Sequence, residues 1–547
     1  MGENIFFSSC VFSVIFCFRI ISAIYSHITD CDETYNYWEP SHYLLFGNGF
    51  QPWEYSPQFA LRSYLYILIY NAPAWIFYKV FHPSRLFLFY LTRCCLAAFC
   101  AICETFFYRS VCREFSDNVG RIMLVILLFS PGMFIACTAF LPSSFSMYMT
   151  MLSMSSWFDK KYPLAVFFVA VSSLLSWPFA GIIGSPIAFE IVFLQKRWRQ
   201  FLKWCILSAI IILIPLSLTD YMYYGKFTLT PWNIIKYNIF TSQGPNLYGK
   251  SPWYFYILNG FLNFNISFLF ALSTPLLLIW IKMTISSVTG NRCGLPYILS
   301  LGSLYLWFIV FFTQPHKEER FLFPVYPLIA LCGAIGMDRV QMLWYRYFIK
   351  GKLFHYVKVT QKISIIALIC YVLLGVSRIL LMYKSYHAPT FIYGQLKTVK
   401  TTMINKNEIN LCIGKEWHRF PSSYFLPDGW TVNFIKTEFR GQLPAHYLPS
   451  KEASKIVRTD MNDLNKEQVS RYVNLNTCDY LVDLDSVSPT PLEPMYSRHS
   501  NWTSVYSIQF LDGSRTPLYA RSFYIPILWE WQSVFSDYFL LKRNENT

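Results

Sequence analysis

The organisation of this chain is read most directly from residues 28–59, ITDCDETYNYWEPSHYLLFGNGFQPWEYSPQF, which follow the first apolar segment. This acidic loop contains no Lys or Arg, and its five carboxylates are Asp30, Asp32, Glu33, Glu39 and Glu54. Lys and Arg hold loops between membrane spans on the cytoplasmic side, whereas Asp and Glu influence topology little. We therefore expect the acidic loop to lie on the lumenal or external face of a membrane.

The composition supports a membrane protein. Of the 547 residues, 54% are apolar, 19% are aromatic and only 14% are charged, and the formal net charge is +15. These values are typical of a polytopic α-helical protein surrounded by membrane lipids. The Lys and Arg residues form short clusters beside apolar runs, as expected for loops that face an anionic cytoplasmic leaflet. This distribution argues against nucleic acid as a partner.

Apolar segments predict about eleven transmembrane helices. The first, residues 5–26, lacks the basic start and the small-residue cleavage site of a signal peptide, so we expect a retained helix. The others lie near 60–79, 86–108, 122–141, 145–158, 163–194, 205–219, 255–281, 295–313, 321–338 and 363–383. Pro178 and Pro186 predict interrupted helices within 163–194, which are tolerated at membrane depth only where they are buried or face a cavity.

Three basic clusters orient these spans, because each is expected in the cytoplasm. They are Lys79 with Arg85, then Lys196, Arg197, Arg199 and Lys203, and finally six residues between Arg339 and Lys362. With a cytoplasmic N terminus, an odd number of spans places the acidic loop, residues 220–254, residues 314–320 and the tail on the lumenal face. Two groups disagree, since this count makes Arg109, Arg113, Arg121, Lys160 and Lys161 lumenal.

The chain is predicted to have two domains, a transmembrane catalytic domain over 1–383 and a lumenal C-terminal domain over 384–547. The second contains short apolar strands at 409–413, 431–435 and 480–484, separated by polar stretches with Pro, and reads as a soluble mixed α/β domain.

Cysteines and glycosylation signals give weaker evidence about this domain. Cys412 and Cys478 could form a disulfide in an oxidising lumen, but only the residue count suggests it, so the question stays open. Asn501-Trp502-Thr503 is an acceptor sequence for N-glycosylation, whereas Asn265-Ile266-Ser267 lies at a span boundary and is a poorer candidate.

Two charged clusters are predicted to carry the chemistry. Asp30, Asp32 and Glu33 place three carboxylates within four residues, which suits deprotonation or binding. Residues 314–320, QPHKEER, wedge five ionisable groups between two apolar spans, where charges are costly and usually paired or functional. The alternative is that residues 314–320 form a lumenal turn without a catalytic role, whose charged side chains reach the lipid headgroups. His316, Lys317 and Arg320 nevertheless suit a phosphate, which favours a lipid-phosphate substrate.

Aromatic residues in the loop after Asp220 are candidates for facing a sugar. They include Tyr248, Trp253 and Tyr254. The alternative is an aromatic belt at the membrane surface, which is common in membrane proteins, and the sequence does not separate the two.

Several strings carry a family resemblance. They are DCDETYNYWEPSHYLLFGNGFQPWEYSPQFALRSY (30–64), TAFLPSSF (138–145), GPNLYGKSPWYFYILNGFLNFN (244–265), QPHKEERFLFPVYPL (314–328) and, in the tail, KEWHRFPSSYFLPD (415–428) and EFRGQLP (438–444). They resemble the dolichyl-phosphate-mannose-dependent mannosyltransferases of glycosyltransferase family 22, which have the GT-C fold. Within this family the α-1,2-mannosyltransferases of lipid-linked oligosaccharide assembly are most similar.

The resemblance implies transfer of mannose from dolichyl phosphate mannose to a dolichyl-diphosphate-linked oligosaccharide on the lumenal face of the endoplasmic reticulum membrane. The seventh and ninth mannoses would be added in α-1,2 linkage. A β-linked donor and an α-linked product imply inversion by one displacement with one base. The acidic pair of the family falls on Asp32 and Glu33, so we predict Asp32 as the base, with Asp30 and Glu33 as orienting groups.

The resemblance also gives the second cluster a role. His316, Lys317 and Arg320 would contact the donor phosphate, and Glu318 and Glu319 would hold those cations. No metal or other cofactor is expected.

Two other functions fit parts of the sequence. A mannosyltransferase of glycosylphosphatidylinositol assembly would keep the fold and change the acceptor. A transporter would also contain broken helices and buried charges, but the acids gather in a loop on one side and no paired repeat is visible.

Overall fold

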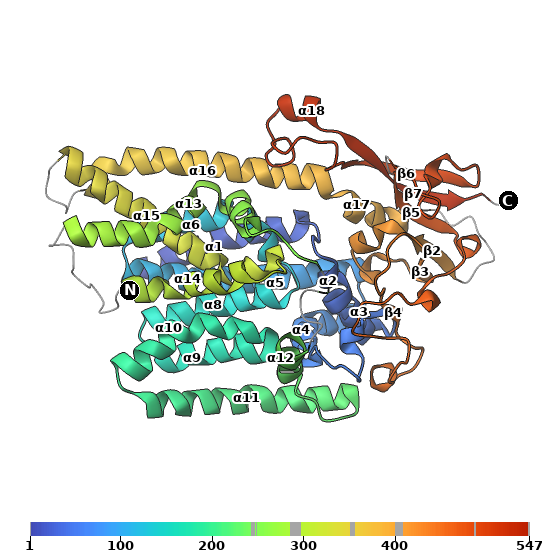
Figure 1. The fold of residues 1–547 in the computed structure, drawn as a ribbon, viewed down its shortest axis with the longest axis horizontal. Coiled ribbons are helices and arrows are strands. Elements are labelled where there is room, and N and C mark those ends of the chain that lie inside the picture. Colours follow the sequence, from blue (N-terminus) through green and yellow to red (C-terminus); the bar gives the residue numbers. More distant parts are fainter. Residues whose placement is uncertain are drawn as a thin grey trace. The chain divides into compact units, whose positions relative to one another are not determined.

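The computed structural model describes residues 2–241, 247, 249–284, 297–349, 356–399, 408–485 and 488–544 (Figure 1). The α-helices are α1 (Gly2–Tyr25), α2 (Cys31–Glu33), α3 (Glu39–Phe46), α4 (Tyr64–Phe81), α5 (Arg85–Glu114), α6 (Asp117–Phe129), α7 (Pro131–Ala136), α8 (Pro142–Phe158), α9 (Tyr162–Val171), α10 (Ser185–Phe189), α11 (Trp198–Tyr224), α12 (Thr230–Phe240), α13 (Phe255–Thr284), α14 (Tyr297–Thr313), α15 (Tyr326–Trp344), α16 (Tyr356–Tyr386), α17 (Ala388–Gln395) and α18 (Leu528–Gln532). The strands are β1 (Phe50–Gln51), β2 (Ile409–Ile413), β3 (Trp430–Phe434), β4 (Ala445–His446), β5 (Tyr480–Leu484), β6 (Trp502–Leu511) and β7 (Phe535–Arg543).

The chain forms two compact units. Unit 1 comprises residues 1–24, 94–216 and 234–379, and unit 2 comprises residues 25–93, 217–233 and 380–547. The sequence-based division assigned the acidic loop to the transmembrane domain, but the structure groups it with the C-terminal residues. One physical reason is the antiparallel pairing of β1 with β4, in which Phe50 lies opposite His446.

Apolar helices identify a polytopic membrane protein. In the described residues, five helical segments are long and apolar enough to cross a membrane: Arg85–Glu114, Trp198–Tyr224, Phe255–Met283, Glu319–Ile349 and Tyr356–Tyr386. Shorter apolar helices occupy Ser9–Tyr25, Tyr162–Ser176, Pro178–Leu194 and Ile298–Thr313. Within unit 1, the buried guanidinium of Arg19 on α1 pairs with the buried Glu104 carboxylate on α5 at 2.8 Å, as charges inside a membrane require.

The predicted interruption of residues 163–194 is confirmed. Trp177 is extended, with φ −135° and ψ 106°, and a 3₁₀ segment over Pro178–Gly184 precedes α10. A second break was not predicted: Asn265 has φ 36° and ψ −123° inside α13. Its buried amide donates to the Tyr371 carbonyl at 3.3 Å, so the Asn265 sequon is inaccessible.

The helix α4 covers most of the predicted span at 60–79. At its start, the Tyr64 hydroxyl lies 3.3 Å from that of Tyr447, and just after its end Arg85 pairs with Asp428 at 2.8 Å. Both ends therefore contact residues of the C-terminal segment within unit 2. Within the described residues, α4 is not among the helices that are long and apolar enough to cross a membrane, so the predicted span at 60–79 is not supported.

A five-stranded sheet in unit 2 has the order β3-β2-β5-β7-β6. The strand β2 pairs in parallel with β3 and β5, whereas β7 pairs antiparallel with β5 and β6. The predicted strands at 409–413, 431–435 and 480–484 correspond to β2, β3 and β5, so these predictions are confirmed to within one residue. The longer strands β6 and β7 were not predicted.

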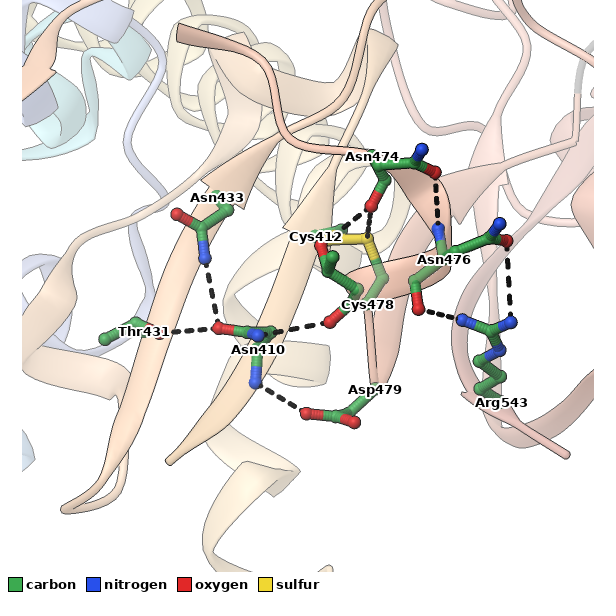
Figure 2. Close-up of a disulfide and its surroundings, with 10 residues drawn as sticks. Asn410, Cys412, Thr431, Asn433, Asn474, Asn476, Cys478, Asp479 and Arg543 are labelled. Atoms are coloured by element: carbon green, nitrogen blue, oxygen red, sulfur yellow. Dashed lines mark hydrogen bonds between the residues drawn. A yellow bond between two sulfur atoms is a disulfide. The ribbon is translucent and has the colours of Figure 1, made fainter. Parts of the chain in front are cut away.

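A disulfide joins Cys412 on β2 to Cys478, just before β5, with a Cα–Cα distance of 5.7 Å (Figure 2). This resolves the open question from the sequence. Beside it, the Asn410 side-chain oxygen accepts hydrogen bonds from Thr431 at 3.1 Å and Asn433 at 3.3 Å, which tie β2 to β3.

Candidate active site

The short helix α2, near the start of the acidic loop, positions the first carboxylates of this loop. Asp30 is the N-cap of α2, and its Oδ1 accepts a 2.9 Å hydrogen bond from the backbone N–H of Asp32. A capping side chain satisfies a helix N–H that would otherwise lack a partner. Asp30 therefore fixes the backbone that carries Asp32.

Glu33 and Glu39 are buried and are occupied by structural hydrogen bonds. The Glu33 Oε1 accepts from the indole N–H of Trp38 at 3.0 Å. Glu39 accepts from the Ser423 backbone N–H at 2.7 Å, the Ser423 hydroxyl at 2.8 Å, the Ser422 hydroxyl at 3.0 Å and the Phe50 N–H at 3.0 Å. Such a set of charge-assisted hydrogen bonds identifies Glu39 as a structural carboxylate.

The turn after α3 needs glycine for this packing. Gly49 has φ +146°, and a Cβ at this position would lie 2.9 Å from the backbone oxygen of Glu39. Only glycine combines this backbone conformation with so close an approach.

Asp32 and Glu54 form an electrostatic group with Arg62. Asp32 and Glu54 are half-buried, and the Glu54 Oε1 accepts a 3.3 Å hydrogen bond from the Asn36 amide. Burial raises the pKa of Glu54 to about 7, the charge of Arg62 opposes this rise, and the charge of Asp32 adds to it. The three side chains therefore influence one another's charge, as groups at catalytic sites commonly do.

Arg62 was not singled out in the sequence. Its guanidinium lies 5.8 Å from the centre of the Tyr37 ring, and its buried Nε has no hydrogen-bond partner among the described residues. A signal for it was present, because Arg62 is the first Lys or Arg after Arg19 and directly follows the acidic loop.

Three residues of the acidic loop place possible cation ligands together. Ligand atoms of Asp30, Cys31 and Asp32 lie within 4.8 Å of one another. However, Asp30 already caps α2, and a thiol is a soft ligand that Mg²⁺ and Ca²⁺ disfavour. This group alone does not identify a metal site.

Unit 1 contains the second charged cluster, residues 314–320. Glu318 joins two of its cations: its Oε1 lies 2.8 Å from His316 Nε2, and its Oε2 pairs with Arg320. The Glu318 hydrogen bond raises the pKa of His316, while burial opposes this rise. The structure thus brings His316, Glu318 and Arg320 together.

Lys317 and Glu319 have other partners. Lys317 is buried, and its ammonium donates to the backbone carbonyl of Gln314. Glu319 accepts a 2.9 Å hydrogen bond from the Asn263 amide and is attracted electrostatically to Arg378.

The aromatic segment before α13 packs against this cluster. His316 Nδ1 lies 3.0 Å from the Gly249 carbonyl, and the Ser251 N–H donates to the Pro315 carbonyl at 2.9 Å. Trp253 and Tyr254 are exposed, with ring centres 5.8 Å apart. Tyr248 lies outside the described residues. Exposure of Trp253 and Tyr254 fits a sugar-facing surface and a membrane belt equally well.

Comparisons with known proteins agree with the resemblance. The profile described as the Alg9-like mannosyltransferase family matches residues 10–427. Alpha-1,2-mannosyltransferase ALG9 from Mus musculus is 44% identical over 540 residues, which cover 98% of this chain and 88% of that protein. Alpha-1,2-mannosyltransferase Alg9 from Drosophila melanogaster is 44% identical over 534 residues, covering 96% and 86%. A crystal structure of ArnT from Cupriavidus metallidurans bound to undecaprenyl phosphate aligns with a TM-score of 0.49 and 11% identity, covering 80% of this chain and 86% of that one.

Proposed function

Since the chain belongs to the Alg9-like mannosyltransferase family, we propose that it is an inverting α-1,2-mannosyltransferase of GT-C type acting in N-glycan precursor assembly. The donor is dolichyl phosphate mannose. The acceptor is a dolichyl-diphosphate-linked oligosaccharide, to which the enzyme adds the seventh and the ninth mannose. The observation that carries this proposal is the match to the mouse α-1,2-mannosyltransferase over 98% of the chain. Both charged clusters lie inside the residues that the family profile matches.

Asp32 is the proposed base. Among the three neighbouring carboxylates, Asp30 caps α2 and Glu33 is buried against Trp38, whereas Asp32 is half-buried and lies in the field of Arg62. Asp32 takes the proton from the 2-hydroxyl of the acceptor. The oxygen of this hydroxyl attacks C1 of the donor mannose. The bond from C1 to the phosphate oxygen breaks, and its electron pair leaves with dolichyl phosphate. A positioned base contributes about 10² to 10⁴ in rate.

Arg62 and Glu54 are proposed positioning residues for this base. A cation near Asp32 favours the charged carboxylate that can accept a proton. Asn36 holds Glu54 through the 3.3 Å hydrogen bond, so the group is tied to the segment that follows α2.

The donor phosphate is the proposed ligand of His316, Lys317 and Arg320. Glu318 supports this role, because its carboxylate orients His316 and Arg320 and favours the charged imidazole. Donors aimed at charge that develops on the leaving phosphate contribute about 10² to 10³ each. The buried position of Lys317 means that its ammonium would have to exchange the Gln314 carbonyl for phosphate.

The corrected span set supports a lumenal site in the endoplasmic reticulum membrane. The five long apolar helices, the four shorter ones, α8, and α6 with α7 together make eleven crossings. With α4 removed and residues 163–194 counted as two crossings, Arg109, Arg113, Arg121, Lys160 and Lys161 become cytoplasmic. The basic groups that disagreed now obey the rule that Lys and Arg favour the cytoplasmic side.

Two contacts agree with this topology. Arg113 at the end of α5 pairs with Asp159 after α8 at 2.7 Å, so these two ends share one face. The Cys412–Cys478 disulfide fits an oxidising lumen around the C-terminal residues.

Product analysis tests the proposed function. Purified protein is incubated with dolichyl phosphate mannose and defined acceptors, namely lipid-linked oligosaccharides and a glycosylphosphatidylinositol precursor. We expect α-1,2-linked mannose on the lipid-linked oligosaccharide alone. Transfer to the glycosylphosphatidylinositol precursor alone would support the second acceptor class. Membership of a glycosyltransferase family argues against the transporter alternative.

A further inference from the structure

The connection between β6 and β7 in unit 2 exposes an unusual number of apolar side chains. It includes α18, which Figure 1 shows at the end of the ribbon that extends beyond these two strands. Of the ten large apolar side chains that are exposed in the described residues after His387, six lie in residues 517–532, here termed the apolar tip. They are Leu518, Tyr519, Ile525, Ile527, Leu528 and Trp531. Clustered exposed apolar residues mark a binding surface, whereas single ones are normal on a protein surface.

The apolar tip is fixed to the C-terminal end of α16. The Lys384 ammonium donates a 3.0 Å hydrogen bond to the Tyr524 hydroxyl and lies 4.3 Å from the centre of the Tyr524 ring. Leu381 packs in one buried cluster with Leu511 and Trp529. The tip therefore lies at the depth at which α16 ends.

The exposed apolar side chains of α16 indicate where this helix ends relative to the membrane. Exposed apolar side chains recur along this helix at a spacing of three or four residues: Ile366, Ile369, Leu373, Val376 and Leu380. This spacing forms one stripe of a helix. The next turn contains Lys384, a residue that typically reaches the headgroups at the end of a span. The end of α16, and with it the tip, is therefore at the boundary between hydrocarbon and water.

From this placement we infer that the apolar tip inserts into the membrane interface, in the leaflet where α16 ends, and anchors the C-terminal part of unit 2 to lipid. Trp and Tyr favour this interface, and apolar side chains gain free energy when they enter it. The tip combines Trp531, which is 79% exposed, with exposed aliphatic side chains that precede α18 or lie at its start. The occupant of this surface is the phospholipid bilayer. This inference does not depend on the proposed catalytic residues.

Site-specific photo-crosslinking tests the inference in the full-length protein. Benzoylphenylalanine replaces Trp531 in one variant and Val469 in the other, and both are reconstituted into phosphatidylcholine vesicles that contain an alkyne-tagged phosphatidylcholine. Val469 is a matched control, because it is an apolar residue of unit 2 that is 69% exposed and far from the tip in sequence. We expect severalfold more lipid on the peptide that contains position 531 than on the peptide that contains position 469.

Equal lipid labelling at the two positions would overturn the inference. So would a crosslink from position 531 that yields only a second copy of the chain. If the Trp531 variant does not fold, as judged by gel filtration, the same replacement at Ile527 provides the test, because Ile527 is 65% exposed in the same segment.

Discussion

The Glu39 carboxylate accepts a 2.7 Å hydrogen bond from the backbone N–H of Ser423, a residue 384 positions later in the chain. This contact and its neighbours fasten the acidic loop to the C-terminal residues within unit 2. The loop that carries Asp32 therefore has a fixed backbone. In the proposed mechanism, this rigidity would hold the base in position before the acceptor arrives.

Replacing Glu39 should reduce stability. In Glu39→Gln, the new amide N–H groups would face hydrogen-bond donors, and an unsatisfied buried group costs about 1–3 kcal/mol. Detergent gel filtration after heating should give a lower midpoint for this variant than for wild type. Glu452→Gln is the control, since Glu452 belongs to the same unit and is exposed. Equal midpoints for the two variants would contradict the structural role of Glu39.

The raised pKa of Glu54 predicts a pH dependence of stability. Its pKa of about 7 in the folded chain exceeds the ordinary value of 4.5, so the folded state binds more protons between these two values. This group therefore reduces the free energy of unfolding as the pH rises from about 4.5 to about 7. Glu54→Gln should unfold at about the same temperature as wild type at pH 5 and at a higher temperature than wild type at pH 8. A difference that is independent of pH would contradict the burial of this carboxyl.

Glu318 and Glu319 provide a matched pair for the phosphate site. Glu318→Gln weakens the hold on His316 and Arg320, whereas Glu319→Gln alters the contact with Asn263. If the cations bind the donor phosphate, Glu318→Gln should raise KM for dolichyl phosphate mannose more than Glu319→Gln does.

Arg320 itself should be sensitive to geometry as well as charge. Arg320→Lys keeps the charge and loses the planar fork, so we expect reduced turnover, with a larger loss of about 10² to 10³ in Arg320→Ala. Turnover is measured at saturating acceptor and normalised to folded protein. Wild-type turnover in both variants would contradict a role of Arg320 in binding the donor phosphate, and residues 314–320 would then be a charged turn without a catalytic role.

The glycosylation signals differ in accessibility. Asn501 is exposed just before β6, whereas Asn265 is buried inside α13. If the C-terminal residues are lumenal, protein from cells should shift in mobility after glycosidase treatment. The shift should disappear in Asn501→Gln and persist in Asn265→Gln. Cleavage of the C-terminal residues by protease added outside intact microsomes would contradict this topology.

The sequence predicts well those features that depend on local pattern. Apolar runs of strand length bounded by polar residues locate β2, β3 and β5, and Pro178 locates a helix break. The apolar run at 60–79 forms α4, which is not among the span candidates of the described residues. Both ends of this helix contact the C-terminal residues, which a local sequence pattern does not show.

The candidate site was predictable only in part. The acidic and basic clusters stand out because charges are rare near spans. The sequence does not show which carboxylates are structural and which are catalytic, because Glu39 and Ser423 come into contact only in the folded chain. Arg62 was missed for the same reason, because its relation to Asp32 and Glu54 depends on how the loop turns back.

The measurement that tests the account most directly is the turnover of Asp32→Asn with dolichyl phosphate mannose and a lipid-linked oligosaccharide. Asn is nearly isosteric with Asp but cannot accept the proton, so turnover should fall by about 10² or more while donor affinity stays nearly unchanged. Asp30→Asn and Glu33→Gln, normalised to folded protein, should retain more activity than Asp32→Asn. Retention of most wild-type turnover by folded Asp32→Asn would contradict the assignment of Asp32 as the base.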